Sequence, residues 1–478
     1  PNSIGKFGGD TDNWMWPRHT GDFSMFRVYA SKDNRPAAYS PQNVPYRPKK
    51  HFSISTKGVK EGDFTMIYGF PGNTQEYILS DAVAYIAERS DPAKIAVRTG
   101  RLDIITKAQE SDPALRIHYA AKHASIANAW KKWQGEALGI DRRGTVAAKF
   151  DYETQFGLWS VGRPEYAGVV MGLRAEYDRI MDAYFAYEIT RETLSTLPAA
   201  YTPEERSEEC FARRKFAEQA LWRHAFREYG RCPKVYRTPS YAEGMARYKS
   251  PEAYADALFE AVWEGSDSVA MQPAVRLREE TKRMLDHISW MLGTKSLRNL
   301  NSKILNELYT TYIKGLREWD RERAFYPDAN LTLRVAYGSV AGYEYADGEY
   351  HKPQTTLDGI IAKDNPEIYD YDIPQSLRDL YASKNYGRWG TVIDGRRTVP
   401  VCFLATNHTT GGNSGSPVLN AGGELIGINF DRTWRSTMSD IAFDPAICRN
   451  IAVDIRYVLF VVDRVGGAGY LLKEMTLK

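Results

Sequence analysis

The chain has 478 residues, enough for two or three domains, and its composition is ordinary for a globular protein. A formal net charge of +3 is too close to neutral to indicate a nucleic-acid or anionic-membrane partner. No apolar run approaches the roughly 20 residues of a membrane-spanning helix. The sequence also lacks zinc-ligand, phosphate-binding and dinucleotide-binding patterns, so we expect no membrane span, no metal and no cofactor.

The first segment of the chain is predicted to be β-rich. Residues 6–22 form a polar loop that contains two tryptophans, which loops seldom expose without a use. Residues 23–29 alternate between apolar and polar side chains, as a half-buried strand does, and residues 52–55 and 64–72 continue in this style. We therefore predict that residues 1–75 are part of a small barrel.

The pattern then changes to a helical period. Long segments rich in Ala, Glu, Arg and Leu run through residues 80–89, 204–229, 251–263 and 275–292. No repeat of fixed length accompanies them. This helical block separates two β-rich segments, so we predict an inserted helical domain over residues 76–330.

The last segment returns to strand patterns. Residues 331–338 alternate, and residues 399–404 read as a buried strand. A glycine-rich turn follows, then an apolar stretch at 452–463, and a last helix is predicted after the glycines at 466–469. We assign residues 331–478 to a second β-barrel with a terminal helix.

Four cysteines are scattered over the last two segments. They are Cys210, Cys232, Cys402 and Cys448. Two disulfides between sequence neighbours and four free buried thiols are equally consistent with this spacing.

The glycine-rich turn leads into a predicted hairpin that carries candidate site residues. Strands at 418–419 and 425–430 flank the turn residues 420–423. Since the two strands are antiparallel, the residues after the second strand, Asp431 and Arg432, are expected close to Ser414.

Ser414 is a candidate nucleophile. Attack by a serine on an acyl carbon places negative charge on the carbonyl oxygen, and backbone N–H groups stabilise that charge. Gly412 and Ser414 are the expected donors of this oxyanion hole. The alternative is an ordinary Gly/Asn/Ser turn. The elbow of α/β-hydrolases does not fit, because Ser416 stands where its last glycine belongs.

Residues 412–417, Gly-Asn-Ser-Gly-Ser-Pro, resemble the nucleophile turn of chymotrypsin-like serine peptidases. The longer run 406–432, together with Asn-Trp-Met-Trp-Pro-Arg-His-Thr-Gly-Asp at 13–22, resembles the S46 family of bacterial dipeptidyl peptidases. The resemblance implies a mixed α and β fold, a chymotrypsin-like double β-barrel with a large inserted α-helical cap domain. It also implies that the first barrel is incomplete in this chain.

The resemblance implies a role for each matching residue. Asp22 corresponds to the triad aspartate, whereas its position after a glycine is also that of a common turn residue. A second set would bind the free N-terminus of the substrate: Asn13, Trp14, Asp431 and, on a helix of the inserted domain, Asn128.

Arg432 corresponds to the residue that separates two branches of the family. A glycine there goes with broad, largely hydrophobic specificity, and an arginine goes with Asp or Glu before the scissile bond. The alternative for Asp431 and Arg432 is a pair of surface ion pairs at a strand end.

The histidine of the triad is not identified. None of the eight histidines stands in the context of the family's catalytic histidine, which lies upstream of the segment with Asp22, and His408 belongs to the serine motif. The expectation is that the chain is a fragment or a processed form and that the base lies on a missing N-terminal segment.

The sequence thus predicts a serine exopeptidase that releases N-terminal dipeptides whose second residue is Asp or Glu. Its partners would be peptides with a free N-terminus. The resemblance further implies a periplasmic homodimer in a bacterium. The alternatives are the broad-specificity type 7 branch and a non-catalytic protein that binds peptide N-termini.

Overall fold

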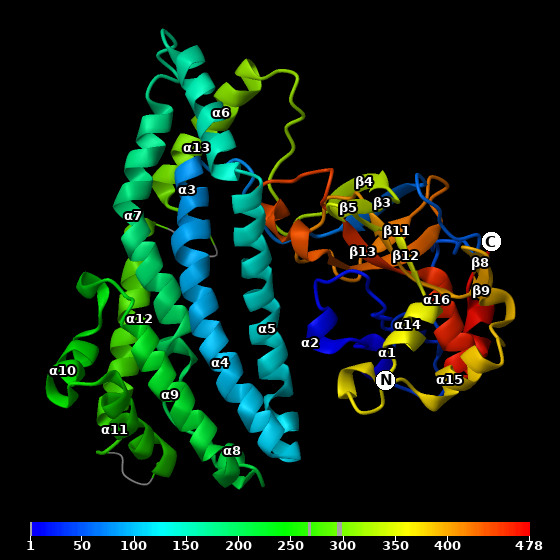
Figure 1. The fold of residues 1–478 in the computed structure, drawn as a ribbon, viewed down its shortest axis with the longest axis horizontal. Helices are drawn as coiled ribbons and strands as arrows, with labels where there is room; N and C mark the ends of the chain where they lie inside the picture. The colour runs from blue at the N-terminus through cyan, green and yellow to red at the C-terminus, as the bar shows by residue number, and fades with distance from the viewer. Residues whose placement is uncertain (1, 266–268, 294–298) are drawn as a thin grey trace. The chain divides into compact units, whose positions relative to one another are not determined.

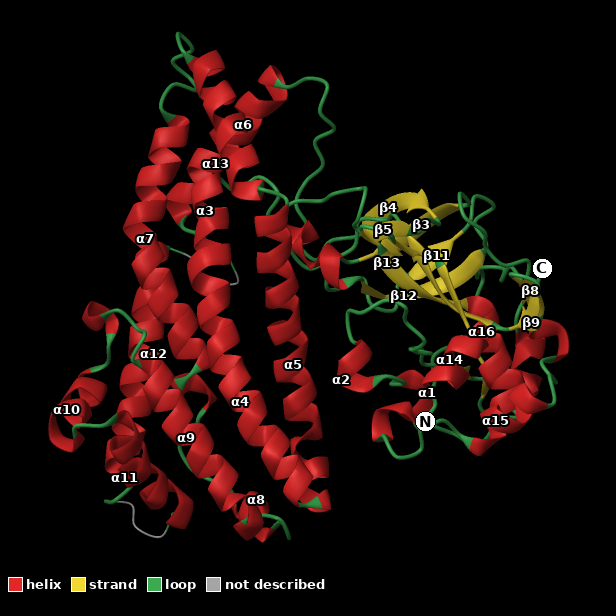
Figure 2. Ribbon diagram, in the orientation of Figure 1, coloured by secondary structure: helices red, strands yellow, loops and turns green. Residues whose placement is uncertain are grey.

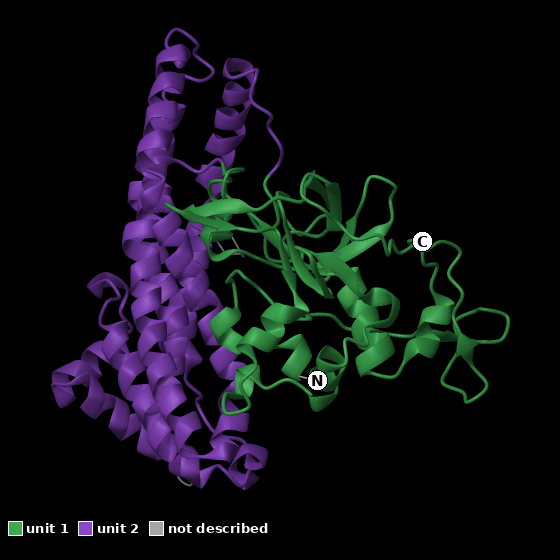
Figure 3. Ribbon diagram, turned by 45° about the vertical axis from the view of Figure 1, so that its right-hand side comes forward, with its two compact units in different colours: residues 1–76, 328–478 green, residues 77–327 purple. Residues whose placement is uncertain are grey.

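The computed structural model describes residues 2–265, 269–293 and 299–478. The chain forms two compact units (Figure 3). Residues 77–327 make up the helical unit, and residues 1–76 together with 328–478 make up the sheet unit. Within the described residues, no helix is both long and apolar enough to cross a membrane.

Long helices joined by short loops form the helical unit (Figures 1 and 2). They are α3 (Ser80–Ala84), α4 (Asp91–Ser111), α5 (Pro113–Arg142), α6 (Thr145–Ser160), α7 (Val169–Glu192), α8 (Pro203–Ser207), α9 (Lys215–Tyr229), α10 (Pro239–Tyr248), α11 (Pro251–Glu264), α12 (Gln272–Leu292) and α13 (Lys303–Trp319).

Local sequence sets the boundaries of these helices. The Asp112 side chain accepts a hydrogen bond from the Ala114 N–H at 2.7 Å, and Pro113 fills the first helical position, so α5 begins here. Buried aromatic side chains, among them Phe156, Tyr177 and Phe226, fill the centre of the unit. The periodic apolar stripes of the sequence therefore face this core.

Strands dominate the sheet unit. Their bounds are β1 (Tyr29–Ala30), β2 (Val44–Pro45), β3 (Phe64–Gly69), β4 (Arg334–Ser339), β5 (Tyr343–Ala346), β6 (Glu349–His351), β7 (Gln354–Thr356), β8 (Thr391–Ile393), β9 (Arg396–Thr398), β10 (Pro400–Ala405), β11 (Pro417–Leu419), β12 (Leu425–Arg432) and β13 (Asn450–Asp454). Seven of them form one sheet in the order β4-β3-β11-β12-β13-β10-β7, and the neighbouring strands are antiparallel.

The ends of β4 and β10 also meet. Val340 forms an isolated bridge with Ala405, and the Ala341 N–H donates to the Leu404 carbonyl oxygen at 3.2 Å. The sheet therefore curves back on itself around a small core that contains Ile67, Phe403 and Val418.

Strand β3 comes from the first part of the chain but lies in the sheet of the last part. Phe64 is paired with Ser339 of β4, and Val418 of β11 is paired with Ile67. The sequence analysis places residues 64–69 in a first barrel, whereas here they extend the sheet that carries Ser414. Strand pairing over such a separation leaves no local signal. The double barrel stays a prediction.

Two smaller expectations are wrong. The strand expected over residues 23–29 appears only as the short β1, and Phe26 is 89% exposed. Alternating apolar and polar side chains suit a half-buried strand. A stable strand also needs a neighbouring strand edge to pair with. The helix expected after residues 466–469 is a 3₁₀ segment at Gly469–Glu474, and the helical turn α16 (Ile455–Phe460) precedes it.

Further short helices complete the sheet unit. They are α1 (Asn2–Gly5), α2 (Gly9–Asp12), α14 (Leu357–Lys363) and α15 (Gln375–Ala382). Tyr457 and Phe460 of α16 are buried in the larger core of this unit.

All four cysteines are free and buried. Burial raises the pKa of Cys402 to about 12 and those of Cys232 and Cys448 to about 11. Cys232, Cys402 and Cys448 are therefore protonated at neutral pH, and the open choice between disulfides and thiols is resolved in favour of free thiols for all four.

Candidate active site

Ser414 lies in the turn that precedes the predicted hairpin. Strands β11 and β12 pair with Pro417 opposite Ile428 and Val418 opposite Gly427. The Ser414 hydroxyl donates to the Phe430 carbonyl oxygen at 3.2 Å, one residue before Asp431. The hairpin therefore brings the end of β12 to the exposed serine, as the sequence predicts.

Glycine is required at the start of this turn. Gly412 has φ +106°, and a Cβ atom there would lie 2.3 Å from the Phe70 carbonyl oxygen. The Asn413 carbonyl oxygen accepts from the Asn429 side chain at 3.1 Å, and this tie fixes the turn to β12. Among the described residues, the N–H groups of Gly412 and Ser414 donate no hydrogen bond. The turn thus presents two donors beside the hydroxyl.

Asp431 receives three donors. Its Oδ2 accepts from the Trp14 backbone N–H at 3.1 Å and from Arg18 at 2.7 Å, and its Oδ1 accepts from the Arg432 N–H at 2.8 Å. The Arg18 and Asp431 side chains are only 7% and 8% exposed. The structure therefore joins the 13–22 loop to the end of β12 through a buried ion pair.

Trp14 links the two charged residues at the end of β12. Its backbone donates to Asp431, and the Arg432 guanidinium lies over its ring at 5.6 Å from the centroid. Trp14 has φ +65°, which is uncommon for a bulky side chain. Asn13, the residue directly before it, follows the last residue of α2. Trp14 therefore contacts Asp431, and the roles expected of Asn13 and Trp14 stay predictions.

Arg432 forms an ion pair with Asp440 of the same chain. Its two terminal nitrogens donate to Asp440 Oδ1 at 2.7 Å and Oδ2 at 2.8 Å, and one of them also donates to Ser439 Oγ at 2.8 Å. The residue is 4% exposed. The ion pair expected as the alternative is thus present, but it is buried and not on the surface.

Asp22 lies near the same charges. The residue is more than a third exposed, yet desolvation by the protein around its carboxyl group raises the pKa. Arg18 opposes this rise and Asp431 adds to it. Asp22 is thus within electrostatic reach of the end of β12.

No described histidine bonds to Ser414 or Asp22. His408, the nearest in sequence, lies 3.2 Å from Glu76 Oε1 through Nδ1 and 3.0 Å from the Ser439 carbonyl oxygen through Nε2. Burial lowers its pKa. His408 therefore faces the segment behind Arg432 and not the serine hydroxyl.

Asn128 belongs to the other unit. It is an exposed residue of α5. Its expected role toward the substrate amine stays a prediction.

Sequence reasoning missed Arg18 and Asp440. Each supplies the counter-charge of a predicted site residue, and a buried charge requires such a partner. The rule predicts that a counter-charge exists for each buried charge. It does not say which of the 63 Lys and Arg or the 60 Asp and Glu residues provides it.

The helical unit holds one group of potential metal ligands among the described residues. His118, Glu208 and Cys210 offer atoms within 4.8 Å of one another. The buried guanidinium of Arg214 donates to Glu208 at 2.9 Å and lies 2.7 Å from His118 Nε2. This cation already uses the carboxylate, so the group forms a network that holds Arg214.

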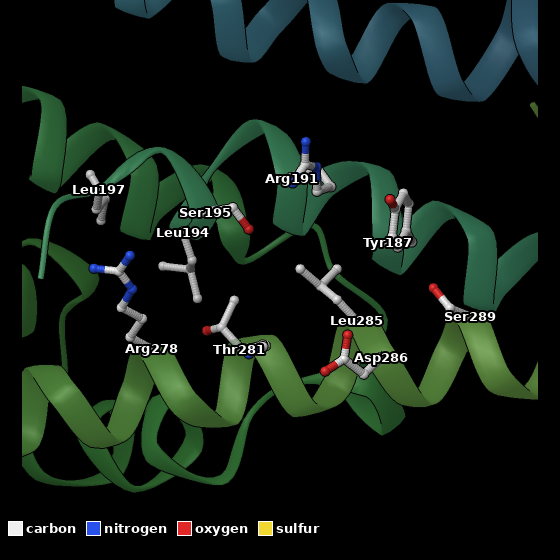
Figure 4. Close-up of a pocket in the computed structure, with 11 residues that line it drawn as sticks. Tyr187, Arg191, Leu194, Ser195, Leu197, Arg278, Thr281, Leu285, Asp286 and Ser289 are labelled. Carbon is white, nitrogen blue, oxygen red and sulfur yellow. The ribbon is translucent and has the colours of Figure 1, made fainter. Parts of the chain in front are cut away.

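A pocket of about 420 Å³ also opens in the helical unit, at α7 and α12 (Figure 4). It is lined by Tyr187, Arg191, Leu194, Ser195, Leu197, Arg278, Thr281, Lys282, Leu285, Asp286 and Ser289. None of these is a predicted site residue, and no histidine is among them. The pocket therefore lacks the groups for acyl transfer.

Comparison with known proteins finds a matching family and similar chains. The family described as Peptidase S46 matches residues 1–216 and 205–477. The Asp/Glu-specific dipeptidyl-peptidase of Capnocytophaga gingivalis is 41% identical over all of this chain and 72% of its own length. That of Flavobacterium psychrophilum is 42% identical with the same coverage.

A solved structure is also similar. Porphyromonas endodontalis DPP11 in complex with the dipeptide Arg-Glu has a TM-score of 0.84 and 34% identity, and the match covers 100% of this chain and 74% of that one. The dipeptidyl-peptidase 7 of Phocaeicola vulgatus is 34% identical over 100% of this chain and 71% of its own length.

Proposed function

Because the chain belongs to the peptidase S46 family, we propose that it is a serine exopeptidase that releases N-terminal dipeptides whose second residue is Asp or Glu. Relatives with this named specificity are 41% and 42% identical to it over its whole length. The observation that supports this specificity is the geometry of Arg432 at the end of β12. Its two terminal nitrogens donate to both carboxylate oxygens of Asp440, which shows that the guanidinium can bind a carboxylate through two bonds.

Ser414 is the nucleophile. Its Oγ attacks the carbonyl carbon of the second substrate residue while a histidine takes the hydroxyl proton. The N–H groups of Gly412 and Ser414 stabilise the oxyanion, since they are near the hydroxyl and have no other acceptor among the described residues. Asp22 orients this histidine.

The acyl-enzyme forms when the tetrahedral intermediate collapses. The histidine returns its proton to the leaving amine, and the shortened peptide departs. A water molecule then attacks the acyl carbon, again with the histidine as base, and releases the dipeptide. Asp22 stabilises the imidazolium in both steps.

Asp431 with Asn13 and Trp14 binds the substrate's free ammonium. A carboxylate has about four lone-pair sites. Three are used by Trp14, Arg18 and Arg432, so one remains for the ammonium. Asp431 directly follows Phe430, whose carbonyl oxygen accepts from the Ser414 hydroxyl. Its charge therefore lies at a fixed distance from the nucleophile, and this distance selects cleavage after the second substrate residue. The role of Asn128 toward the same ammonium rests on the family resemblance alone.

The proposed setting is the periplasm of a bacterium, with the protein as a homodimer that acts on peptides. The relatives compared above, which support this setting, come from bacteria.

The test is hydrolysis of two fluorogenic dipeptides by the full protein, one with Glu and one with Leu before the leaving group. We expect a strong preference for Glu. A preference for Leu would move the protein to the broad-specificity branch. Absence of turnover by the folded protein, with retained binding of free-amine peptides, would indicate a non-catalytic binding protein.

A further inference from the structure

Asp440 holds Arg432 in the way that an acidic substrate side chain would. Its two carboxylate oxygens lie 2.7 and 2.8 Å from the two terminal nitrogens of the guanidinium. This parallel pair of bonds is the preferred geometry between Arg and a carboxylate. An Asp or Glu side chain of a substrate therefore meets a guanidinium that already has a carboxylate partner.

The position of Asp440 is fixed by its backbone. It ends a 3₁₀ segment at Trp434–Asp440 whose residues 436–439 are buried. The Asp440 carbonyl oxygen accepts from the Gln75 N–H at 2.6 Å, and the preceding carbonyl, that of Ser439, lies 3.0 Å from His408 Nε2. These anchors hold the backbone of Asp440 beside Arg432 and do not involve its carboxylate.

Each of the two neighbouring ion pairs joins one positive and one negative charge. Arg18 offsets Asp431, and Asp440 offsets Arg432. For a neutral substrate side chain this balance changes little. A carboxylate gains attraction from Arg432 but also meets repulsion from Asp440, and both act over short distances in a poorly solvated site.

Building on the proposed function, we propose that Asp440 is a second specificity-determining residue, a built-in competitor that limits how strongly Arg432 favours acidic over neutral substrates. It acts through Arg432 and is not a catalytic residue. Removal of its charge should then raise the selectivity for an acidic side chain, which general damage to the site would not do.

The experiment compares dipeptide substrates that end in Glu or in Gln, because the two side chains differ in charge but hardly in shape. The variant Asp440→Asn keeps the size of the side chain and one acceptor for Arg432. We expect the Glu-to-Gln ratio of kcat/KM to rise at least about fivefold, because removal of one like charge at about 4 Å has this effect even in the dielectric of water, and a poorly solvated site strengthens it. The change should appear in KM for the Glu substrate, with kcat nearly constant.

A ratio that stays the same or falls would overturn the proposal, since Asp440 would then serve only to orient Arg432. The variant Asp440→Ser repeats the test with a small uncharged side chain, in case the amide of Asn misplaces the guanidinium. The variant Asp440→Glu keeps the charge and should leave the ratio at or below its original value.

Asp364 provides the matched control. Its carboxylate also accepts two bonds from one guanidinium, from Nε of Arg378 at 2.7 Å and from a terminal nitrogen at 2.8 Å, and its side chain is 14% exposed against 15% for Asp440. Asp364→Asn should leave the Glu-to-Gln ratio unchanged, and a shift of equal size would attribute the effect to lost stability.

The ratio of the unmodified protein tests a different claim. If that ratio shows no preference for Glu, the proposed function fails. If the preference exists and Asp440→Asn does not raise it, the competitor role alone fails. Calorimetric binding of the dipeptides Ala-Glu and Ala-Gln gives the same comparison without turnover.

Discussion

Two segments meet at Asp431, and different interactions shape them. The hairpin β11–β12 is held by backbone pairing between residues close in sequence. The loop over residues 13–22 is held by side chains whose partners lie hundreds of positions away. Trp16 Nε1 donates to the Lys352 carbonyl oxygen at 3.0 Å, and Arg18 pairs with Asp431.

The difference sets the proposed nucleophile apart from the groups proposed to bind the substrate's ammonium. Ser414 and the proposed oxyanion donors lie beside the hairpin, where regular pairing gives a rigid frame. The groups proposed to bind the substrate's ammonium lie where the loop and β12 touch, so they depend on long-range contacts. Damage to the turn that carries Ser414 should therefore abolish turnover, whereas loss of the loop contacts of Trp14 or Arg18 should weaken binding and stability. Asp22 is the exception on the loop, because it is proposed to orient the base.

The largest effect is expected from Ser414→Ala. Loss of the nucleophile should lower kcat by about 10⁴- to 10⁶-fold, because only the oxyanion donors and substrate binding would remain. Dipeptide affinity measured by calorimetry should change little. Ser416→Ala, in the same turn, is the matched control and should retain turnover. Normal activity of Ser414→Ala would remove the hairpin from the mechanism.

Asp431→Ala removes the carboxylate at which the 13–22 loop and β12 meet. It leaves the buried Arg18 without its carboxylate, which should cost about 3–5 kcal/mol of unfolding free energy in denaturant titrations. The double variant Arg18→Met with Asp431→Leu replaces both charges by apolar groups and should recover most of that stability. It should not recover binding of free-amine peptides. Recovery of binding would show that Asp431 has only a structural role.

Arg432→Gly sharpens the comparison from the hairpin side. Loss of the guanidinium should lower kcat/KM for Glu substrates by about 30- to 150-fold, or roughly 2–3 kcal/mol, with a smaller change for Leu substrates. Arg432→Lys keeps the charge but cannot bind a carboxylate through two parallel bonds. Its kcat/KM for Glu substrates should therefore lie between those of the unmodified protein and of Arg432→Gly. Equal losses on Glu and Leu substrates would contradict a role in specificity.

The smallest effect is expected from His19, a buried residue of the loop. Burial first, then Lys363 and Arg18, lower its pKa from 6.5 to about 3. The folded state thus binds fewer protons than the unfolded state, so His19 should reduce stability as the pH falls from about 6.5 towards 3. Melting temperatures between pH 7 and pH 4 measure the slope, and His19→Gln should flatten it. A variant with an unchanged slope would place the acid sensitivity elsewhere.

The sequence allows prediction of what depends on local pattern. The turn residues 420–423 between short apolar runs predict the hairpin, and Ser414 does lie beside the end of β12. The helical block is equally clear from its period. The resemblance to a family supplies Asp22, Asn13 and Trp14, which no local pattern would single out.

Long-range pairing is what the sequence does not reveal. Nothing near residues 64–69 indicates that β3 pairs with β4 and β11, since register depends on strands far along the chain. The left-handed backbone of Trp14 and the partners Arg18 and Asp440 follow from tertiary contacts in the same way.

The insertion of the helical unit between β3 and β4 has a consequence for how the chain folds. Its two attachment points are fastened within the sheet unit, where Thr74 Oγ1 donates to Asp328 Oδ1 at 2.6 Å and the Ala329 N–H donates to Thr74 Oγ1 at 2.9 Å. Within the helical unit, the Tyr77 hydroxyl donates to the Tyr326 carbonyl oxygen at 2.5 Å.

Both ends of residues 77–327 are thus drawn together by their own contacts, as the ends of a short loop are. A helical unit that folds first brings the sequences of β3 and β4 close together and removes most of the entropy that a flexible loop of that length would lose. The sheet can then form as if β3 and β4 were neighbours in sequence. Such an insertion can gain or lose helices over evolution while the sheet that carries the serine keeps its register.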